Sequence, residues 1–481
     1  MNHQGNRFTS LINVLTSFPL IVIVRSRPEL FLQIVANQFA SAGDGRIQCR
    51  VRKGFAAGMT QISRRSMLKG CALQALGSAS IFSLPALAAA IQTNSTTSQR
   101  PKLKITDVRT AQVMVHGPQT HVRIYTDQGI YGQGECTDAA VGAVSLIRGW
   151  RRMLVGRDPL NVEAIWERIR TLGIFAGAQG GQYVTALSGV EIALWDLAGK
   201  ALGLPVYQLL GGKFRDKVRI YCDSDMDDPI GEESDRKLPW IKNQGFTAMK
   251  IDLDDARDPA RFDSVNWTAS NGEIDRMVKW VSHVRESIPA NMDLACDMHG
   301  RYDAPTGKKV AKALEPFRLM WLEEPVPAED IDAMADIRHS TSTPIACGEN
   351  LYMRWGYREL LEKRAVDIVQ PDFQKVGGLA EAQKVANMAQ AYYVPVAPHC
   401  VVSPIGVMAT AHACMTYPNF LACEWHWINH PDLWKSWVKE GEIIVNGYVT
   451  PTDRPGIGVE MNEDVAKKAQ IPGTTWFEAE K

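Results

Sequence analysis

An excess of charge of either sign is the first thing that this chain of 481 residues lacks. Its 53 basic and 53 acidic side chains cancel, so the charge balance does not indicate nucleic acid or an anionic membrane surface as a partner. The apolar run Phe18–Val24 is too short to cross a bilayer, which takes about 20 residues. We therefore expect a small-molecule partner, with no nucleic acid and no membrane insertion.

Cysteine is present, but the spacing of a metal site is missing. Two of the nine cysteines, Cys49 and Cys71, lie in the first hundred residues. The others are odd in number and show no zinc-type pattern. We expect them to be buried structural thiols: Cys136, Cys222, Cys296, Cys347, Cys400, Cys414 and Cys423.

Three carboxylates recur at an equal spacing. Asp297, Glu323 and Glu349 are 26 residues apart, and each closes a short apolar run. One strand, one helix and two loops take about that length in a (β/α)₈ barrel, where the strand ends converge on one face. Three like charges at one point require a cation, and an all-oxygen cluster suits Mg²⁺. The pattern predicts a magnesium enzyme with these three residues as metal ligands.

A similar spacing continues toward the C-terminus, where Asp372, His399 and Glu424 close further apolar runs. The runs are short, rich in Val, Ile, Leu and Ala, and separated by helix-length segments, as buried parallel strands are. They predict a barrel domain over residues 216–430. Its eight expected strands are Val218–Asp223, Thr247–Asp252, Asp293–Met298, Leu319–Glu323, Pro344–Glu349, Asp367–Asp372, Tyr393–His399 and Phe420–Glu424.

The first hundred residues are of a different kind. A paired-arginine motif, Ser63–Lys69, precedes an uncharged stretch that ends in small residues at Ala88. These features are typical of a twin-arginine export signal, and they predict a periplasmic mature protein. Met59, four residues before the motif, is a candidate for the true translation start. The predicted order is an unassigned extension, the signal and a polar linker: residues 1–58, 59–88 and 89–101.

A smaller α+β domain precedes the barrel over residues 102–215. Lys104–His116 and Thr120–Thr126 are predicted to be antiparallel strands around a Gly-Pro turn. The glycine-rich loop Gly173–Gly181 matches no phosphate-binding motif, so we interpret it as a lid over the barrel mouth. The C-terminal segment, residues 431–481, is expected to return to this domain.

From Lys102 onward the chain resembles the enolase superfamily, mandelate racemase subgroup. The motifs that carry the resemblance are Ala193-Leu194-Trp195-Asp196, Leu209-Leu210-Gly211-Gly212, Trp321-Leu322-Glu323-Glu324-Pro325, Gly348-Glu349-Asn350, Gln370-Pro371-Asp372 and Gly377-Gly378. Asp297–Arg301, Leu314–Arg318 and Ala397–Cys400 most resemble D-galactonate dehydratase and related acid-sugar dehydratases. The resemblance implies a (β/α)₇β modified TIM barrel with an N-terminal α+β capping domain, in a homo-oligomer.

Removal of a proton next to a carboxylate creates an enediolate, whose charge must be stabilised where it develops. Mg²⁺ on the three carboxylates would supply that stabilisation. The proton also needs a base. His399 can serve because Asp372, at the end of the preceding strand, can orient its ring and stabilise the imidazolium. The pair matches the His-Asp dyad of the subgroup.

Loss of a β-hydroxyl requires a proton, which predicts a general acid. His299 lies two residues beyond Asp297 and is expected on the same strand face. By resemblance it is the acid of the dehydratases, and the racemases lack it. The second strand carries Lys250-Ile251-Asp252 in place of the two lysines of the racemases. One base and one acid favour dehydration over racemisation.

Further residues are candidates for substrate binding. Lys250 is expected to neutralise the substrate carboxylate, and Asp252 either accepts a hydrogen bond from a substrate hydroxyl or is a loop residue. By resemblance, Glu424 binds the enediolate or carboxylate. Arg301 either binds the polyhydroxy chain or carboxylate of the substrate or forms an exposed ion pair. Two last candidates either line the sugar site or pack in the core: Trp425 and His426.

Together these patterns predict a Mg²⁺-dependent hydro-lyase of sugar-acid catabolism. It would convert a galactonate-like aldonate or an aldarate to a 2-keto-3-deoxy acid. Two alternatives stay open. One is an epimerase or cycloisomerase of the same superfamily, and the other is an exported protein that binds or senses sugar acids without turnover.

Overall fold

The computed structural model describes residues 21–23, 33–35, 47–50, 59–62 and 100–479, apart from residues 138, 139, 227, 256–260, 262 and 264. The chain divides into two units, Met1–Gln99 and Arg100–Lys481. The first holds two antiparallel strand pairs, and the predicted twin-arginine motif lies outside its described residues. The pairs are β1 (Ile21–Ile23) with β2 (Gln33–Val35), and β3 (Ile47–Arg50) with β4 (Met59–Ile62).

The second unit begins with a three-stranded antiparallel sheet of β5 (Ile105–Met114), β6 (Pro118–Thr126) and β7 (Tyr131–Cys136). Both connections are short hairpins, and the first is the Gly-Pro turn that the sequence predicts. Gly129, in the second turn, has a φ of 77°, which glycine adopts without steric cost.

Three helices cover the sheet: α3 (Ala143–Leu154), α4 (Val162–Leu172) and α5 (Gly181–Leu202). Helix α5 is buried along most of its length because it contacts the sheet on one side and the barrel on the other. Close contact between α5 and the sheet requires small residues on the strand. On β7, Gly132 and Gly134 let the strand lie directly against the α5 backbone.

The barrel strands are parallel and pair in sequence order, and the last pairs with the first to close the ring. They are β8 (Val218–Asp223), β9 (Ala248–Asp252), β10 (Asp293–Asp297), β11 (Trp321–Glu323), β12 (Ile345–Cys347), β13 (Ile368–Val369) and β14 (Cys423–Trp425). The strand expected at Tyr393–His399 is reduced to bridges from Val396 to its two neighbours, Val369 and Phe420. The predicted barrel with its capping domain is confirmed.

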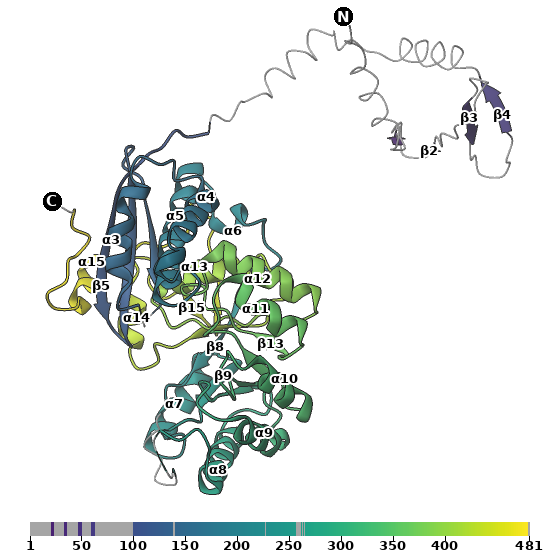
Figure 1. The fold of residues 1–481 in the computed structure, drawn as a ribbon, viewed down its shortest axis with the longest axis vertical. Coiled ribbons are helices and arrows are strands. Elements are labelled where there is room, and N and C mark those ends of the chain that lie inside the picture. Colours follow the sequence, from purple (N-terminus) through teal and green to yellow (C-terminus); the bar gives the residue numbers. More distant parts are fainter. Residues whose placement is uncertain are drawn as a thin grey trace, which may run out of the picture. The chain divides into compact units, whose positions relative to one another are not determined.

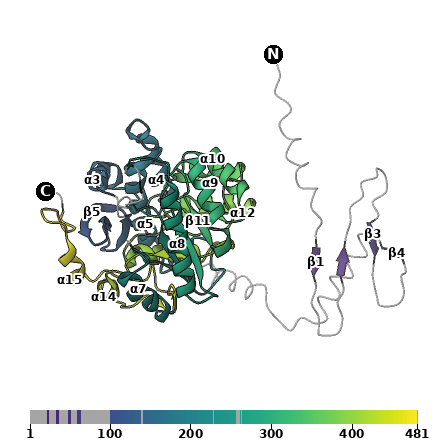
Figure 2. The same cartoon turned by 90° about the horizontal axis from the view of Figure 1, so that it is seen from below.

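Helices surround these strands, and both views show the capping elements, in blue, to one side of the green barrel helices (Figures 1 and 2). The barrel helices are α7 (Glu232–Asn243), α8 (Asn271–Ser287), α9 (Ala304–Ala313), α10 (Ile331–Ser340), α11 (Met353–Glu362), α12 (Leu379–Ala391) and α13 (Pro404–Cys414). No helix in the described part of the chain is both long and apolar enough to cross a membrane.

One layer of side chains fills the barrel interior, with one residue from each strand position: Tyr221, Ala248, Ala295, Trp321, Ala346, Ile368, Ala397 and Ala422. Two aromatic side chains, Tyr221 and Trp321, and mostly small residues fill the interior of the barrel. The barrel is therefore a packed core, and its functional groups lie at one end. The seven cysteines after residue 100 are all buried free thiols, as predicted.

The C-terminal segment runs back along the capping sheet (Figure 1). It contains α14 (Pro431–Ser436), β15 (Ile444–Val445), β16 (Tyr448–Val449) and α15 (Glu463–Ala466). Strand β16 pairs with β8 at the base of the barrel. Farther on, Gln470 and Trp476 form antiparallel bridges to β5.

The contact between β7 and α5 yields a stability prediction. A Cβ atom at Gly134 would lie 2.2 Å from the carbonyl oxygen of Gly189 on α5. Since backbone atoms cannot step aside cheaply, we expect Gly134→Ala to lower the free energy of unfolding by at least about 1–3 kcal/mol in urea denaturation. Gly149→Ala, on the exposed side of α3 with nothing within 4 Å, should be neutral or stabilising by up to about 1 kcal/mol. Equal effects of the two substitutions would refute the close packing.

Candidate active site

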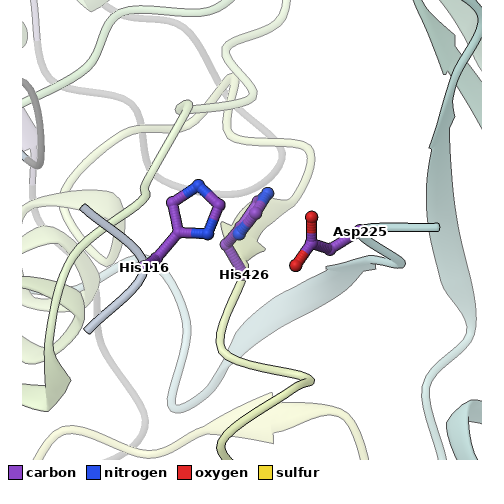
Figure 3. A group of neighbouring side chains, drawn as sticks. All are labelled: His116, Asp225 and His426. Atoms are coloured by element: carbon purple, nitrogen blue, oxygen red, sulfur yellow. The ribbon is translucent and has the colours of Figure 1, made fainter. Parts of the chain in front are cut away.

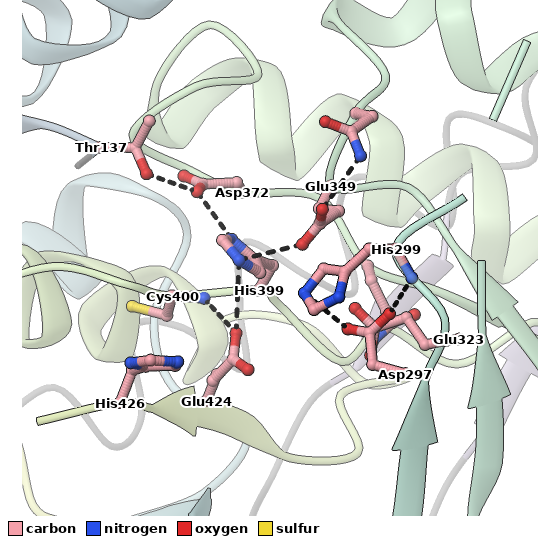
Figure 4. Close-up of polar contacts among 12 residues, drawn as sticks. Thr137, Asp297, His299, Glu323, Glu349, Asp372, His399, Cys400, Glu424 and His426 are labelled. Carbon is pink, nitrogen blue, oxygen red and sulfur yellow. Dashed lines mark hydrogen bonds and ion pairs between the residues drawn. The ribbon is translucent and has the colours of Figure 1, made fainter. Parts of the chain in front are cut away.

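The three predicted ligand carboxylates come together at the carboxyl ends of neighbouring strands. Asp297 ends β10, Glu323 ends β11 and Glu349 lies two residues beyond β12. Asp297 and Glu323 are partners in the strand register. One carboxylate oxygen from each of the three lies within 4.8 Å of the others (Figure 4). All three side chains are buried, so their charges are only weakly screened by water.

Lys250, on β9, is the cation of this cluster. Its Nζ lies 2.8 Å from Oε1 of Glu424 and 2.9 Å from Oδ2 of Asp297. Two more carboxylates follow, Glu323 at 3.5 Å and Asp223 at 3.4 Å. Burial alone would lower the pKa of Lys250, but the Glu323 and Glu424 carboxylates raise it well above its usual range. The lysine therefore stays protonated and compensates part of the negative charge.

The carboxylates still outnumber this single cation. Burial, followed by the neighbouring Asp297 carboxylate, raises the pKa of Glu323 well above its usual range. Trp321 Nε1 and Gln370 Nε2 both donate to Oε2 of Glu323, at 3.0 and 2.7 Å. Its other oxygen, Oε1, is buried and has no hydrogen-bond partner among the described residues. An oxygen-only donor set with an unpartnered carboxylate oxygen fits a hard divalent cation such as Mg²⁺.

Glu324 belongs to a different environment. Its carboxylate accepts a hydrogen bond from Asn350 Nδ2 at 2.8 Å, and Cys347 lies beside it. Burial, and next the Glu349 carboxylate, raise the pKa of Glu324 to about 7. The group of Asp297, Glu323 and Glu349 does not include it, because neighbouring residues of a strand point to opposite sides.

His399 and Asp372 form the predicted pair. The Nδ1 atom of His399 lies 2.8 Å from Oδ2 of Asp372, and Nε2 lies 2.9 Å from Oε2 of Glu349 (Figure 4). Burial alone would lower the pKa of His399, but the carboxylates of Glu349 and Glu424 raise it well above its usual range. With Asp372 behind the ring, Nε2 is the nitrogen that faces the carboxylate cluster.

Thr137, at the end of the capping strand β7, was not foreseen from the sequence. Its Oγ1 donates a hydrogen bond of 3.0 Å to the same Asp372 oxygen that contacts His399. Asp372 Oδ1 accepts from the backbone N–H of Gln374 at 2.8 Å. The carboxylate that orients the histidine is therefore fixed by both domains. No local pattern could reveal this contact, because 235 residues separate its two members.

His299 reaches the cluster by a route that differs from the prediction. Strand β10 ends at Asp297, so His299 does not share a strand face with it; a turn with a φ of 48° at His299 directs the ring instead. Its Nδ1 lies 2.6 Å from Oδ1 of Asp254, and Nε2 lies 3.8 Å from Oδ2 of Asp297. The Asp297 carboxylate, opposed by burial, raises the pKa of His299 well above its usual range.

Asp254 is the partner of His299 that the sequence analysis missed. It lies two residues beyond Asp252, so strand alternation past the end of β9 could have indicated it. Its other oxygen pairs with Arg301 Nε at 3.0 Å. Arg301 is 55% exposed, so the exposed ion pair that the sequence left open is the observed state. Each of the two histidines thus has a carboxylate behind Nδ1 and directs Nε2 toward one of the predicted ligand carboxylates.

Asp252 is the last residue of β9 and not a loop residue. It forms a group with Asp297 and His299 whose ligand atoms lie within 4.8 Å of one another. Burial, followed by the neighbouring Asp223 carboxylate, raises the pKa of Asp252 well above its usual range. Asp223 itself ends β8 and completes the ring of acids, although the sequence analysis did not select it.

Of the two roles that the sequence left open for Trp425, lining the sugar site or packing in the core, the structure shows core packing. It is 3% exposed and stacks on Trp240 and Phe246, with centroid distances of 5.9 and 5.5 Å. Because Glu424 points into the barrel, the next residue of the strand must point outward to the helix layer. Glu424 accepts the backbone N–H of Cys400 at 2.8 Å and is 3.8 Å from His399 Nε2, within the site.

His426 lies beyond β14, with Nε2 3.7 Å from Oδ2 of Asp223. The predicted lid loop, Gly173–Gly181, contains a short 3₁₀ turn and comes close to Tyr352, three residues after Glu349, through Gly180. The loop thus lies beside the residues that follow a metal-ligand strand.

The fold and the site define a capped-barrel enzyme with a carboxylate cluster at the ends of its strands. Sequence profiles match over two ranges: "Mandelate racemase / muconate lactonizing enzyme, N-terminal domain" at residues 89–211 and "Enolase C-terminal domain-like" at residues 235–465. The chain belongs to the enolase superfamily, in the group of mandelate racemase and muconate lactonizing enzymes.

Individual relatives agree with this membership. The chain is 39% identical over 379 residues to D-xylonate dehydratase of Haloferax volcanii, covering 78% of this chain and 91% of that protein. It is 32% identical to D-galactonate dehydratase of Pectobacterium atrosepticum, covering 74% and 92%. A mandelate racemase/muconate lactonizing enzyme-like protein of Rubrobacter xylanophilus superposes with a TM-score of 0.75 at 42% identity, over 79% of this chain and all of that one.

The position of Lys250 yields a prediction for stability. Lys250→Met leaves the buried carboxylates without their cation, and removal of one partner from a buried pair costs about 3–5 kcal/mol. We expect a loss of that size in urea denaturation at neutral pH with EDTA present. Lys308→Met is the matched control, since Lys308 forms a surface pair with Asp336 and its loss should cost under about 1 kcal/mol. If Lys250→Met were as mild as the control, Lys250 would not be the compensating charge.

Proposed function

We propose that the protein removes water from an aldonate, a sugar acid with a single carboxylate, in a Mg²⁺-dependent reaction that yields a 2-keto-3-deoxy acid. The coarser statement, that it is a sugar-acid dehydratase and hence a hydro-lyase, follows from its family and its relatives. The aldonate is supported by the relatives, whose names specify D-xylonate and D-galactonate. Every site residue lies after residue 100, so the proposal does not depend on the predicted export signal.

The observation that carries the proposal is the pair of histidines at the carboxylate cluster. His399 and His299 come from different strand ends, and each has a carboxylate on Nδ1 and directs Nε2 toward a metal-ligand carboxylate. An elimination needs one group to take a proton from carbon and another to give a proton to oxygen. Two oriented histidines at one site meet both needs.

The residues fit Mg²⁺, with Asp297, Glu323 and Glu349 as the ligands. A bound Mg²⁺ would supply positive charge against the negative charge that develops on the substrate carboxylate. Lys250 is held protonated 2.9 Å from the Asp297 carboxylate and adds a fixed positive charge next to the three ligands. Its direct contact with substrate remains a prediction.

A cation on Glu349 would offset the carboxylate that raises the pKa of His399 and so favour its neutral form. Neutral His399 takes the proton from the carbon next to the carboxylate at Nε2. Asp372 then stabilises the imidazolium through Nδ1, and Thr137 keeps the Asp372 carboxylate in place. His299 gives a proton from Nε2 to the departing β-hydroxyl, and Asp254 holds its ring through Nδ1. Water leaves, and the resulting enol becomes the 2-keto-3-deoxy acid.

The two histidine roles can be separated by isotope exchange. In D₂O, His299→Asn should keep exchanging the α-proton of the substrate while product formation falls by roughly 10²- to 10⁴-fold. His399→Asn should lose exchange and product formation together, because the base is missing. Exchange is read by NMR of the recovered aldonate, and 2-keto-3-deoxy acid by a colorimetric assay.

The outcomes of this experiment also test the alternatives. Exchange in the unaltered enzyme with inversion at the α-carbon and no loss of water would identify an epimerase. Tight binding of aldonates without exchange or product would identify a sensing protein. Loss of exchange in His299→Asn would overturn the division of roles.

Metal dependence is tested by removal and return of Mg²⁺. EDTA should abolish turnover, and Mg²⁺ should restore it. Glu323→Gln should weaken Mg²⁺ binding in calorimetry far more than Glu324→Gln, whose effect should stay within the roughly 10- to 100-fold that an outer partner contributes. Equal losses in both variants would contradict the assignment of Glu323 as the ligand.

A further inference from the structure

A second group of ligand-type side chains shares no member with the carboxylate cluster and borders it at Asp223, which both His426 and Asp225 contact. It consists of His116, Asp225 and His426, and one ligand atom from each lies within 4.8 Å of the others. The two histidine rings have centroids 4.1 Å apart at an interplanar angle of 63°. Figure 3 shows the ring of His426 between His116 and Asp225.

The three residues come from three distant parts of the sequence. His116 lies in the turn between β5 and β6 of the capping sheet, Asp225 lies two residues beyond β8, and His426 lies one residue beyond β14. The group therefore spans the capping sheet and the barrel. An ion bound there would tie the capping hairpin to the strand ends.

His426 has a ring nitrogen without a protein partner. The side chain is 9% exposed, and its Nδ1 atom is buried without a hydrogen-bond partner among the residues that the structure describes. A buried ring nitrogen with no partner is costly, because it loses water and gains nothing in return. A bound metal ion would satisfy such a nitrogen.

Asp225 is held in a defined position beside it. Its backbone has a φ of 45°, its backbone N–H donates to Asp223 Oδ1 at 2.9 Å, and its backbone carbonyl accepts from Lys237 Nζ. Its carboxylate accepts from Asn429 Nδ2 through Oδ2. These contacts fix the carboxylate from behind, as the outer partners of metal ligands do.

The ligand chemistry differs from that of the carboxylate cluster. Two imidazoles and one carboxylate suit borderline divalent ions such as Zn²⁺ and Co²⁺, whereas Mg²⁺ prefers oxygen ligands alone. We propose that His116, Asp225 and His426 form a second metal site, selective for a divalent transition metal, that links the capping hairpin to the barrel. The site goes beyond the proposed function and does not depend on it.

Cobalt provides the test, because Co²⁺ with imidazole ligands absorbs visible light. With saturating Mg²⁺ on the full-length protein, Co²⁺ should bind at one additional site and produce a visible spectrum. His116→Asn and Asp225→Asn should each weaken this binding by more than the roughly 10- to 100-fold typical of an outer partner. His339→Asn, at an exposed histidine of α10, is the control and should bind as the unaltered protein does.

Two further measurements separate the new site from the carboxylate cluster. Glu323→Gln should leave the Co²⁺ spectrum in place, since it alters only the Mg²⁺ ligands. Zn²⁺ should raise the Tm of the Mg²⁺-saturated protein, and His116→Asn should remove that shift, because only the folded state binds the ion. Co²⁺ binding that Glu323→Gln abolishes and His116→Asn spares would overturn the proposal, as would the absence of saturable Co²⁺ binding. Loss of dehydratase activity alone would bear only on the proposed function.

Discussion

The rest of the site depends on the imbalance of charge at the carboxyl ends of the barrel strands. Four buried carboxylates lie within 3.5 Å of Lys250 Nζ, a single cation. In a low-dielectric interior such an excess of negative charge is costly unless positive charge completes it. A divalent cation held by Asp297, Glu323 and Glu349 would offset this excess. The positive charge of this ion would then face the carboxylate of a substrate. The excess of negative charge that is costly for stability would thus also hold the ion that the proposed reaction needs.

The capping domain contributes more than a cover, because two of its acids bind the starts of barrel helices. Glu135 accepts the backbone N–H groups of Ser403 and Gly406 at the start of α13, and Glu191 accepts those of Leu379 and Ala380 at the start of α12. Carboxylates are favourable at helix N-termini. Burial raises the pKa of Glu135 to about 7 and that of Glu191 to about 8. Together with the hydrogen bond from Thr137 to Asp372, these contacts join the His399–Asp372 pair to the capping domain.

Spacing and alternation predicted the fold and most of the site, since both follow from the geometry of a barrel unit. The 26-residue interval located the acids, and the order of strands followed from it. Alternation failed where the strand had ended, because His299 turns into the site through a left-handed residue. Trp425 is still within β14, and there alternation agrees with the core packing that is observed. Thr137 could not be predicted because its contact with Asp372 exists only after two domains have packed.

The enclosure of Lys250 also bears on which reaction the site can perform. A second base would be needed on the opposite side of the α-carbon for racemisation, and a lysine in that role must lose its proton. Lys250 cannot readily do so, because the Glu323 and Glu424 carboxylates outweigh burial and keep its pKa well above the usual range. Two residues after Lys250, at the position where the racemases carry their other lysine, this chain has the carboxyl group of Asp252. In the proposed reaction the proton transfers therefore fall to His399 and His299, and one base with one acid favours elimination.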